Sequence, residues 1–510
     1  MRRSLPVLLV LAAVLAVLAP QATAEPRGLD LTWGKCPPSL IGADDPRLLC
    51  ASLPVPLDYR NPKGRTIDIQ VSKLETAKPD KRRGILLHNG GGPGGPSLHL
   101  PAAYVGFYPQ EVLDQYDLVS FDPRGVGYSA PVTCGRTAQG IPSDRYFPFP
   151  AADGSIARNV EFAQELARDC LKHSGDLMPF ITTANTARDM DRIRIALGER
   201  KISYNSGSYG SYLGALYATL FADKTDRFVM GANVDPNRVW HEQWALWDHG
   251  FELRFADVAA WLAERNATYG LGATPAAVRA KYFELVAKLD ANPVTHPQAG
   301  PVNGNLFWFI VFALSYHTVQ FPQQAQWWVF ADGGTPPGAT AAAVPEVPAD
   351  NPRASQLAVL CGDGGFPRDI QHYQREVNLH RKLFPLLNGM GTNIWPCAFI
   401  PEPVESRVKV TGKGPANILL VQTLRDHVTP YAGALGMRHA LGQRAKMVTV
   451  NTGNHGAYDR STPSCATRAA DQFLATGVLP ARDVFCEPDA APPATDKVNP
   501  LLLRQLRESS

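Results

Sequence analysis

The chain has 510 residues, of which 45% are hydrophobic, and its formal net charge is +3. This length allows roughly two to four domains, and the apolar content is ample for a large core. Basic and acidic residues are interspersed and nearly balanced. This pattern excludes a polybasic surface for nucleic acid or for anionic membranes, so we expect no nucleic-acid partner.

The first residues have the order of an export signal. Met1-Arg2-Arg3 is positively charged, Leu5 to Ala19 is apolar, and Ala22-Thr23-Ala24 supplies the small residues of a cleavage site. The apolar run is shorter than the about 20 residues that span a bilayer, as is the later run from Leu306 to Leu314. We therefore expect a cleaved signal over 1–24, a secreted, extracellular protein and no stable membrane anchor.

Eight cysteines in an exported chain indicate four disulfides. The sequence leaves their pairing open. Pairs between successive cysteines close short loops and are the ones we expect: Cys36 with Cys50, Cys134 with Cys170, Cys361 with Cys397, and Cys465 with Cys486. No C-x-x-C motif occurs, and no Cys/His cluster has the spacing of a zinc site, so we expect no metal.

The first structural segments predict a sheet. Ala51–Tyr59 and Thr66–Leu74 flank a polar turn, and the alternation within the second segment indicates an antiparallel hairpin at a sheet edge. Near-continuous apolar strands with glycine-rich turns follow at 84–88, 117–121, 202–204 and 228–234. Such strands are buried on both faces, as in a parallel sheet between helices. A helix is predicted over 186–197, ending at Gly198.

The pattern changes after residue 238. From Val239 to Glu405 it is helical and rich in tryptophan, apart from the Pro/Ala-rich stretch Thr335–Pro352, which predicts an exposed loop. Strands return at 418–424 and 447–450. We expect these parts in order: a signal at 1–24, the N-terminal part of an α/β core at 25–238, a helical lid inserted at 239–405, the C-terminal part of the core at 406–486, and a tail at 487–510.

Ser208 lies in the pattern of a nucleophile elbow. The strand at 202–204 leads through Ser206-Gly207-Ser208-Tyr209-Gly210 into a helix, which matches G-x-S-x-G with Ser206 in the first glycine position. A tight strand–turn–helix exposes the serine hydroxyl, and small neighbours avoid a clash. An ordinary Gly/Ser turn fits the same residues, so the assignment depends on partners elsewhere in the chain.

A serine hydroxyl becomes reactive only when a base takes its proton and a carboxylate orients that base. Asp426 follows the strand at 418–424, and His455 follows the strand at 447–450. This is the Ser, Asp, His order of the α/β-hydrolase fold, and strand-end loops place both side chains at the carboxyl edge of the sheet. The alternatives are a helix-capping aspartate and a surface-loop histidine. His427 competes as base, but Asp426 beside it has no room to orient it from behind.

We therefore predict a Ser208–His455–Asp426 triad on an α/β-hydrolase fold, with a mostly parallel central sheet and an inserted, mainly helical lid. Such chemistry needs backbone N–H donors for an oxyanion. The strand at 84–88 runs into the glycine-rich loop 89–96, and we assign the donors to the amides of Gly92 and Tyr209. A phosphate-binding loop is the rival interpretation, but the loop has no G-K-[ST] and no dinucleotide pattern.

These motifs resemble a known family of serine peptidases. Gly91-Gly92-Pro93-Gly94 is similar to the core of the His-Gly-Gly-Pro-Gly signature of prolyl iminopeptidases, with Gly90 in place of the histidine. The segment 122–129 is similar to the family's Asp-x-Arg-Gly-x-Gly-x-Ser. The segments 207–214 and 426–430 and the later Cys465 resemble secreted bacterial tripeptidyl aminopeptidases. The resemblance covers nearly the whole mature chain.

The resemblance implies removal of short peptides, tripeptides above all, from free N-termini without a metal or organic cofactor. It also implies a C-terminal region, about 415–486, that supplies the acid and the base. An aminopeptidase must recognise a protonated amine, usually with a buried carboxylate. Glu242, Glu252 and Asp363 are candidates, although each also fits a solvated or structurally paired acid. We expect a monomer whose partners are peptide or protein N-termini.

Three more side chains have roles to assign, and two other functions fit the same motifs. Trp327 and Trp328 fit either the lid core or an apolar substrate pocket, and Arg124 is expected to brace its turn through carbonyls or a carboxylate. The same triad serves an esterase or lactonase, because fold and triad do not distinguish esters from amides. A catalytically inactive binding protein is the other alternative, and the intact Ser208, Asp426 and His455 argue against it.

Overall fold

The computed structural model describes residues 31–37, 45–137, 140–297, 299–338 and 347–489. The expected export signal at 1–24 lies outside the described residues, as do the centre of the 335–352 loop and all but the first residues of the tail. Within the described ranges, no helix is long and apolar enough to cross a membrane.

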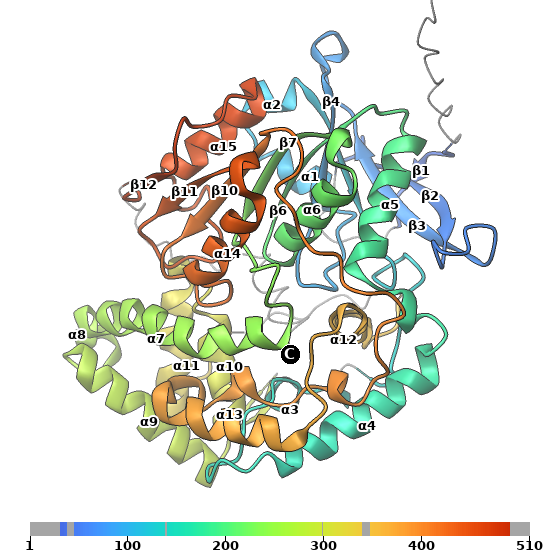
Figure 1. Ribbon diagram of the computed structural model, residues 1–510. Helices are drawn as coiled ribbons and strands as arrows, with labels where there is room; N and C mark the ends of the chain where they lie inside the picture. The colour runs from blue at the N-terminus through green and yellow to red at the C-terminus, as the bar shows by residue number, and fades with distance from the viewer. Residues whose placement is uncertain (1–30, 38–44, 138–139, 298, 339–346, 490–510) are drawn as a thin grey trace, which may run out of the picture.

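A ten-stranded sheet forms one half of the molecule (Figure 1). Its spatial order is β1-β2-β3-β5-β4-β6-β7-β10-β11-β12, and all neighbours from β5 to β12 run parallel. The expected hairpin, now β2 and β3, pairs antiparallel at one edge. The strands are β1 (Gly34–Lys35), β2 (Leu49–Pro56), β3 (Thr66–Leu74), β4 (Gly84–Asn89), β5 (Tyr116–Phe121), β6 (Ile202–Gly207), β7 (Thr225–Gly231), β10 (Ile418–Thr423), β11 (Ala445–Val450) and β12 (Val484–Cys486).

Consecutive residues of the central strands enter two different cores. In β4, Ile85 and Leu87 pack in the core on one face, whereas Leu86 packs in the core on the other face. In β10, Leu420 and Leu419 divide in the same way. Side chains alternate along a strand, so a strand that is apolar throughout needs cover on both sides. The predicted parallel sheet between helices is therefore confirmed.

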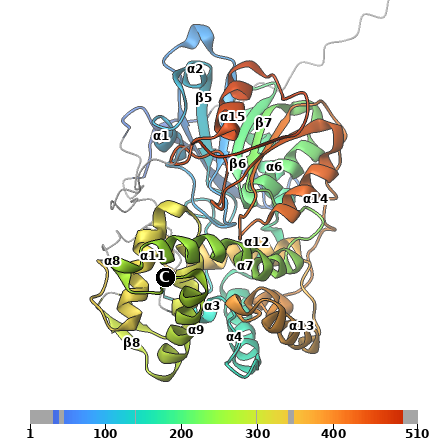
Figure 2. The same cartoon turned by 90° about the vertical axis from the view of Figure 1, so that its left-hand side faces the viewer.

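Helices supply that cover. Figures 1 and 2 show α1 (Leu100–Tyr104), α2 (Gln110–Leu113) and α15 (Cys465–Thr476) on one face, with α5 (Thr183–Ala196), α6 (Tyr209–Leu220) and α14 (Tyr431–Leu441) on the other. Helix α5 starts earlier than the predicted 186–197 because the Thr182 side chain accepts a hydrogen bond from the Asn185 amide and caps the helix. Sheet order, parallel strands and covering helices together confirm the α/β-hydrolase fold.

A helical layer lies against the edge of the sheet where the parallel strands end (Figure 1). Trp328 and Trp327 are buried within this layer, and Trp328 stacks on Phe255, which places both in the lid core. A short β8–β9 hairpin accompanies the helices of the expected, mainly helical lid. The elements are α7 (His241–Glu264), α8 (Asn266–Tyr269), α9 (Pro275–Ala291), β8 (Val294–His296), β9 (Gly300–Val302), α10 (Gly304–Ala313), α11 (Phe321–Asp332), α12 (Asn351–Asp363) and α13 (Ile370–Leu383).

Two helices from the earlier segment join this layer. Helices α3 (Ser143–Tyr146) and α4 (Ala157–Ser174) precede residue 238, yet α3 packs on α10 and α4 on the short 3-10 helix Pro396–Ala398. Both views place them beside the lid helices (Figures 1 and 2). The helical layer thus also uses residues from the range 25–238 that the sequence pattern assigns to the core.

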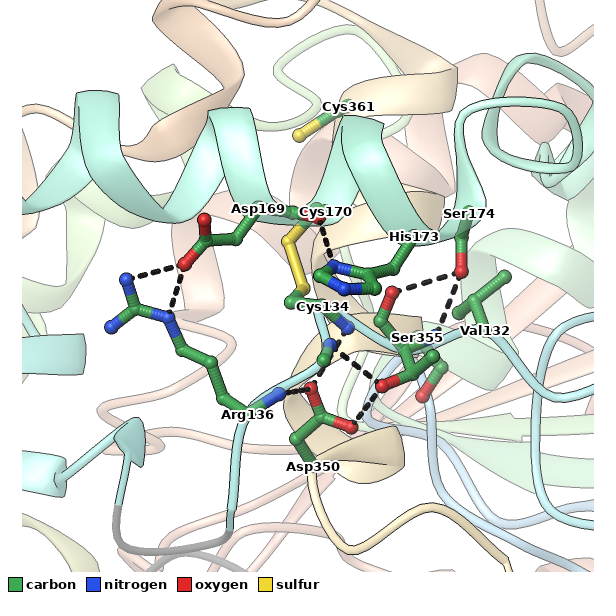
Figure 3. The surroundings of a disulfide bond; sticks show 12 residues. Val132, Cys134, Arg136, Asp169, Cys170, His173, Ser174, Asp350, Ser355 and Cys361 are labelled. Atoms are coloured by element: carbon green, nitrogen blue, oxygen red, sulfur yellow. Dashed lines mark hydrogen bonds and ion pairs between the residues drawn. A yellow bond between two sulfur atoms is a disulfide. The ribbon is translucent and has the colours of Figure 1, made fainter.

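The four expected disulfides are all present: Cys36–Cys50, Cys134–Cys170, Cys361–Cys397 and Cys465–Cys486. Figure 3 shows how Cys134–Cys170 joins the chain after β5 to α4. Beside it, the Asp350 carboxylate accepts hydrogen bonds from the Cys134 amide at 2.8 Å and the Arg136 amide at 3.1 Å. Since Asp350 immediately precedes α12, these bonds fasten the start of α12 to the loop that leaves the sheet.

Candidate active site

Ser208 occupies a strained turn between β6 and α6. Its backbone angles are φ 56° and ψ −130°, and its amide donates to the Gly231 carbonyl of β7 at 3.0 Å. A non-glycine residue in this region costs about 1–3 kcal/mol, which surrounding structure must offset. Ser208 remains partly exposed although Tyr209 and the strand before it are buried. The turn therefore presents the hydroxyl at the start of a helix, as a nucleophile elbow does.

Ser206 fills the position where the usual elbow pattern has glycine. Its Oγ donates to the Asn89 carbonyl at 2.7 Å, which ties the elbow to the end of β4. A β-carbon on Gly210 would collide with that hydroxyl. The Ser206 hydroxyl therefore fits into the turn because Gly210 has no side chain there.

Asp426 and His455 meet at the ends of β10 and β11. His455 Nδ1 lies 2.9 Å from Asp426 Oδ2 and 3.1 Å from Oδ1. Asp426 is fully buried and also accepts bonds from the Val428 amide and from the Thr429 amide and hydroxyl. Burial alone would raise the pKa of Asp426, but the His455 ring and the Thr429 amide lower it overall. The carboxylate can therefore hold the imidazole and stabilise its cation.

His455 Nε2 is free for a second partner among the described residues. No hydrogen bond joins it to the Ser208 hydroxyl in this structure, and such bonds are often long without substrate. His427, the competing base, lies elsewhere: its Nε2 is 3.0 Å from the Phe312 carbonyl, and its ring packs against Phe312 and Tyr316. Burial lowers the pKa of His427 to about 3, so it is neutral at ordinary pH.

The glycine-rich loop after β4 lies beside the elbow. A β-carbon on Gly91 would stand 3.6 Å from Ser208 Cβ. The Gly91 amide is already used, because it donates to Asn89 Oδ1 at 3.0 Å. Within the described ranges, the amides of Gly92 and Tyr209 donate to no other residue. On the far side of the loop, a β-carbon on Gly94 would stand 2.8 Å from the Gln356 amide, so α12 packs directly against the loop at Gly94.

Asp363 ends α12 close to the residue that follows the elbow serine. Its carboxylate accepts from the Thr183 amide at 2.8 Å, the Thr183 hydroxyl at 2.6 Å and Trp240 Nε1 at 3.1 Å. Thr183 Oγ1 in turn lies 3.0 Å from Tyr209 Oη. Burial raises the pKa of Asp363 to about 6, against the lowering effect of its hydrogen bonds. Asp363 is nevertheless partly accessible.

The other two candidate acids have different surroundings. Glu252 forms an ion pair with Arg279 at 2.9 Å and accepts from the Leu386 amide, so it holds lid segments together. Glu242 is exposed in the first turn of α7, and no hydrogen bond links it to the described residues of the triad or the glycine-rich loop. Of the three candidate acids, all of which lie in the described part of the chain, only Asp363 is connected through hydrogen bonds to the elbow.

Two further expectations concern supporting residues and metals. Arg124 braces its turn as expected: it pairs with buried Asp189 at 2.7 Å and donates to the carbonyls of Pro56, Leu57 and Phe180. Among the residues that the structure describes, no group of three or more His, Cys, Asp or Glu side chains is placed to hold a metal ion.

The lid reaches the histidine loop through a segment that the sequence did not indicate. The His455 amide donates to the Tyr316 carbonyl at 2.7 Å, and the Tyr316 ring lies edge-on to the His455 ring with centroids 5.0 Å apart. Residues 315–318 are a short stretch after the apolar helix α10, with no motif of their own.

Known proteins are similar to this chain over most of its length. A family model described as TAP-like protein matches residues 387–486, which include Asp426 and His455. The chain is 35% identical over 460 residues to the tripeptidyl aminopeptidase of Streptomyces lividans, covering 87% of this chain and 84% of that protein. It is 28% identical over 508 residues to serine protease Hip1 of Mycobacterium tuberculosis, covering 94% and 96%.

Two further comparisons involve a protein named as an esterase and a solved structure. A carboxylesterase B of Mycobacterium tuberculosis is 29% identical over 482 residues, covering 90% of both chains. Among solved structures, the proline iminopeptidase of Mycobacterium smegmatis superposes with a TM-score of 0.35 at 14% identity, covering 83% of this chain and 97% of that one.

Proposed function

Because this chain belongs to the tripeptidyl aminopeptidase family and is a serine peptidase of the α/β-hydrolase fold, we propose that it is a secreted exopeptidase that releases tripeptides from free N-termini. The observation that carries the proposal is the hydrogen-bonded Asp426–His455 pair at the ends of adjacent parallel strands, in the chain order that the elbow at Ser208 requires. Peptide and protein N-termini are then its substrates.

The reaction proceeds through an acyl-enzyme. His455 takes the Ser208 proton as the hydroxyl attacks the scissile carbonyl, and Asp426 keeps the imidazole in the required tautomer and stabilises its cation. His455 then protonates the leaving amine. Water then attacks the acyl carbonyl while His455 takes its proton. His455 returns that proton to Ser208 Oγ as the ester bond breaks, and the acyl group leaves as the free tripeptide.

The amides of Gly92 and Tyr209 bind the oxyanion of the tetrahedral intermediate. Both lack another acceptor among the described residues, whereas the Gly91 amide is occupied by Asn89. Tyr209 is the first residue of α6, so the positive end of the helix dipole adds to its donor. Removing one such donor typically costs about 100- to 1,000-fold in kcat.

Asp363 binds the protonated amine of the substrate N-terminus. An ammonium group that leaves water needs a carboxylate, and Asp363 is the candidate acid that is largely desolvated and linked through Thr183 to Tyr209. Glu252 already has Arg279 as its partner, and exposed Glu242 would bind an amine in competition with water. Asp363 therefore sets the distance between the free N-terminus and the scissile bond.

Export is part of the proposal. The described chain holds four disulfides, and such bonds persist in oxidising surroundings outside the cytosol. The charged, apolar and small-residue segments of the first 24 residues have the order of a signal peptide.

An esterase is the second candidate. The likeness to a protein named carboxylesterase B, which covers 90% of both chains, favours it. The same Ser208, His455 and Asp426 would act on an ester, but recognition of an amine by Asp363 would have no purpose there.

The test compares three substrate classes with the purified mature protein: free-amine tripeptide amides, the same peptides with an acetylated N-terminus, and short acyl esters. We expect the free-amine peptides to be cleaved and acetylation to reduce kcat/KM by at least about 100-fold, the size expected when a buried charge loses its partner. Ser208→Ala, with the same far-UV spectrum, should lose all turnover. Cleavage of esters alone would replace the peptidase proposal with the esterase.

A further inference from the structure

A short lid segment, Ser315–Thr318, lies against the loop that carries His455. Besides the bond from the His455 amide to the Tyr316 carbonyl, the amide and the hydroxyl of Thr318 both donate to Asn454 Oδ1 at 3.0 Å. Two consecutive residues of the histidine loop are thus bound to the lid. The contacts join residues more than 130 positions apart in the chain.

Asn454 uses every hydrogen-bonding position of its side chain. Its Oδ1 accepts the two Thr318 bonds, and its Nδ2 donates to Asp459 Oδ2 at 3.2 Å and to Thr462 Oγ1 at 2.9 Å. Its carbonyl accepts from the Thr423 hydroxyl at the end of β10 at 2.6 Å. Asn454 is only 1% exposed, so the cost of leaving any of these groups unpaired would be that of a buried polar atom.

Arg254 of α7 fixes the lid side of this contact. Its side chain, 1% exposed, donates to the Ser315 carbonyl at 2.8 Å, to Thr318 Oγ1 at 3.1 Å and to Asp257 at 2.9 Å. Asp257 also binds Arg425, the residue before Asp426, at 3.0 Å. A β-carbon on Gly453 would collide with the Arg254 guanidinium, so the histidine loop passes directly over it.

From these contacts we propose that the lid segment Ser315–Thr318 positions the general base, with Thr318 and Asn454 as positioning residues. The inference rests on the proposed triad and adds to it. Asp426 fixes the imidazole ring from one side, and the lid fixes the backbone that carries the ring. The lid thereby completes the geometry of His455, and a displacement of about 1 Å of such a group can cost about 100-fold in rate.

The test centres on the Thr318 hydroxyl. Thr318→Val keeps the shape but removes the donor to Asn454 and the acceptor for Arg254; Thr318→Ser keeps both. Val319→Ala changes an exposed neighbour, 41% accessible, and serves as the matched control. Each variant is assayed for kcat and KM on a free-amine tripeptide amide, and for the rate at which a fluorophosphonate labels Ser208. Labelling needs the serine and its base but no recognition of a peptide.

We expect Thr318→Val to lower both kcat and the labelling rate by about tenfold with KM within about twofold, and Thr318→Ser and Val319→Ala to stay within about twofold of the wild type. For each variant, kcat and the labelling rate are divided by the fraction of protein that is labelled at completion. A partly unfolded variant then does not resemble one whose base is misplaced. A Thr318→Val protein with wild-type labelling rate would overturn the inference, even if it melts at a lower temperature. A wild-type protein that the probe does not label would refute the triad itself.

Discussion

Amine recognition by Asp363 should show its own pH dependence. Burial holds the pKa of this carboxyl at about 6 in the folded protein. Only the ionised form attracts an ammonium group, so recognition should be present above pH 6 and lost as the pH falls through that value. From pH 7 to pH 5 the ionised fraction falls from about 10/11 to about 1/11, a change of about tenfold, while a peptide amine with a pKa near 7.7–8.0 stays largely protonated.

The assay must separate amine recognition by Asp363 from the catalytic step at Ser208 and His455. The rate of fluorophosphonate labelling depends on Ser208 and His455 but not on the substrate amine. The ratio of kcat/KM for a free-amine tripeptide amide to this labelling rate therefore removes the shared dependence. We expect the ratio to fall about tenfold between pH 7 and pH 5 in the wild type.

Two variants complete this experiment. Asp363→Asn should lower the ratio at pH 7 and leave it flat with pH, because no charge remains to titrate. Glu242→Gln, at the exposed alternative acid, should reproduce the wild-type curve. A wild-type ratio that does not change between pH 5 and pH 7 would refute the assignment, and so would a Glu242→Gln protein that behaves like Asp363→Asn.

Three further predictions concern the framework of the site. Ser206→Gly and Ser206→Ala should each lower the free energy of unfolding by about 1 kcal/mol in urea titrations, because both remove the buried bond to the Asn89 carbonyl; wild-type stability in both would show that this bond contributes nothing. Cys361→Ala with Cys397→Ala opens a loop with a sequence separation of 36 and should lower the free energy of unfolding by about 4 kcal/mol in the same titration; a loss below about 1 kcal/mol would show that this disulfide does not stabilise the fold by constraining the unfolded chain. Thr429→Val removes one of the bonds to Asp426 and should lower kcat about tenfold without changing KM, as measured by steady-state kinetics; an unchanged kcat would mean that the hydroxyl does not support the acid.

Local patterns were sufficient for much of the fold. Strands such as β4 and β10 are buried at every position because both faces of a parallel sheet are covered, and the near-continuous apolar run at the start of each strand makes this visible in the sequence. The disulfides join successive cysteines, such as Cys361 and Cys397, so the expectation that disulfides close short loops predicted the pairing correctly. The order of Ser208, Asp426 and His455 indicated a serine hydrolase, because this fold places its strand-end loops at one edge.

Other features depended on contacts between distant segments. Helix α4 has an apolar face, and nothing in its own residues says whether the sheet or the lid covers that face; the structure places it against the lid. His427 and His455 both follow strands near Asp426. The position of His427 next to Asp426 already favoured His455 as the base, and packing adds a second reason, because it buries His427 against Phe312 and leaves His455 beside the carboxylate.

The sequence by itself thus determined the fold, the enzyme class and the candidate triad, since these follow from strand periodicity and from motifs that are local in the chain. The tertiary structure alone decided which acid adjoins the elbow and which part of the lid holds the histidine loop. Asp363 meets Thr183, and Thr318 meets Asn454, across 180 and 136 residues. Contacts over such separations arise from the packing of whole layers, and no local pattern of residues encodes them.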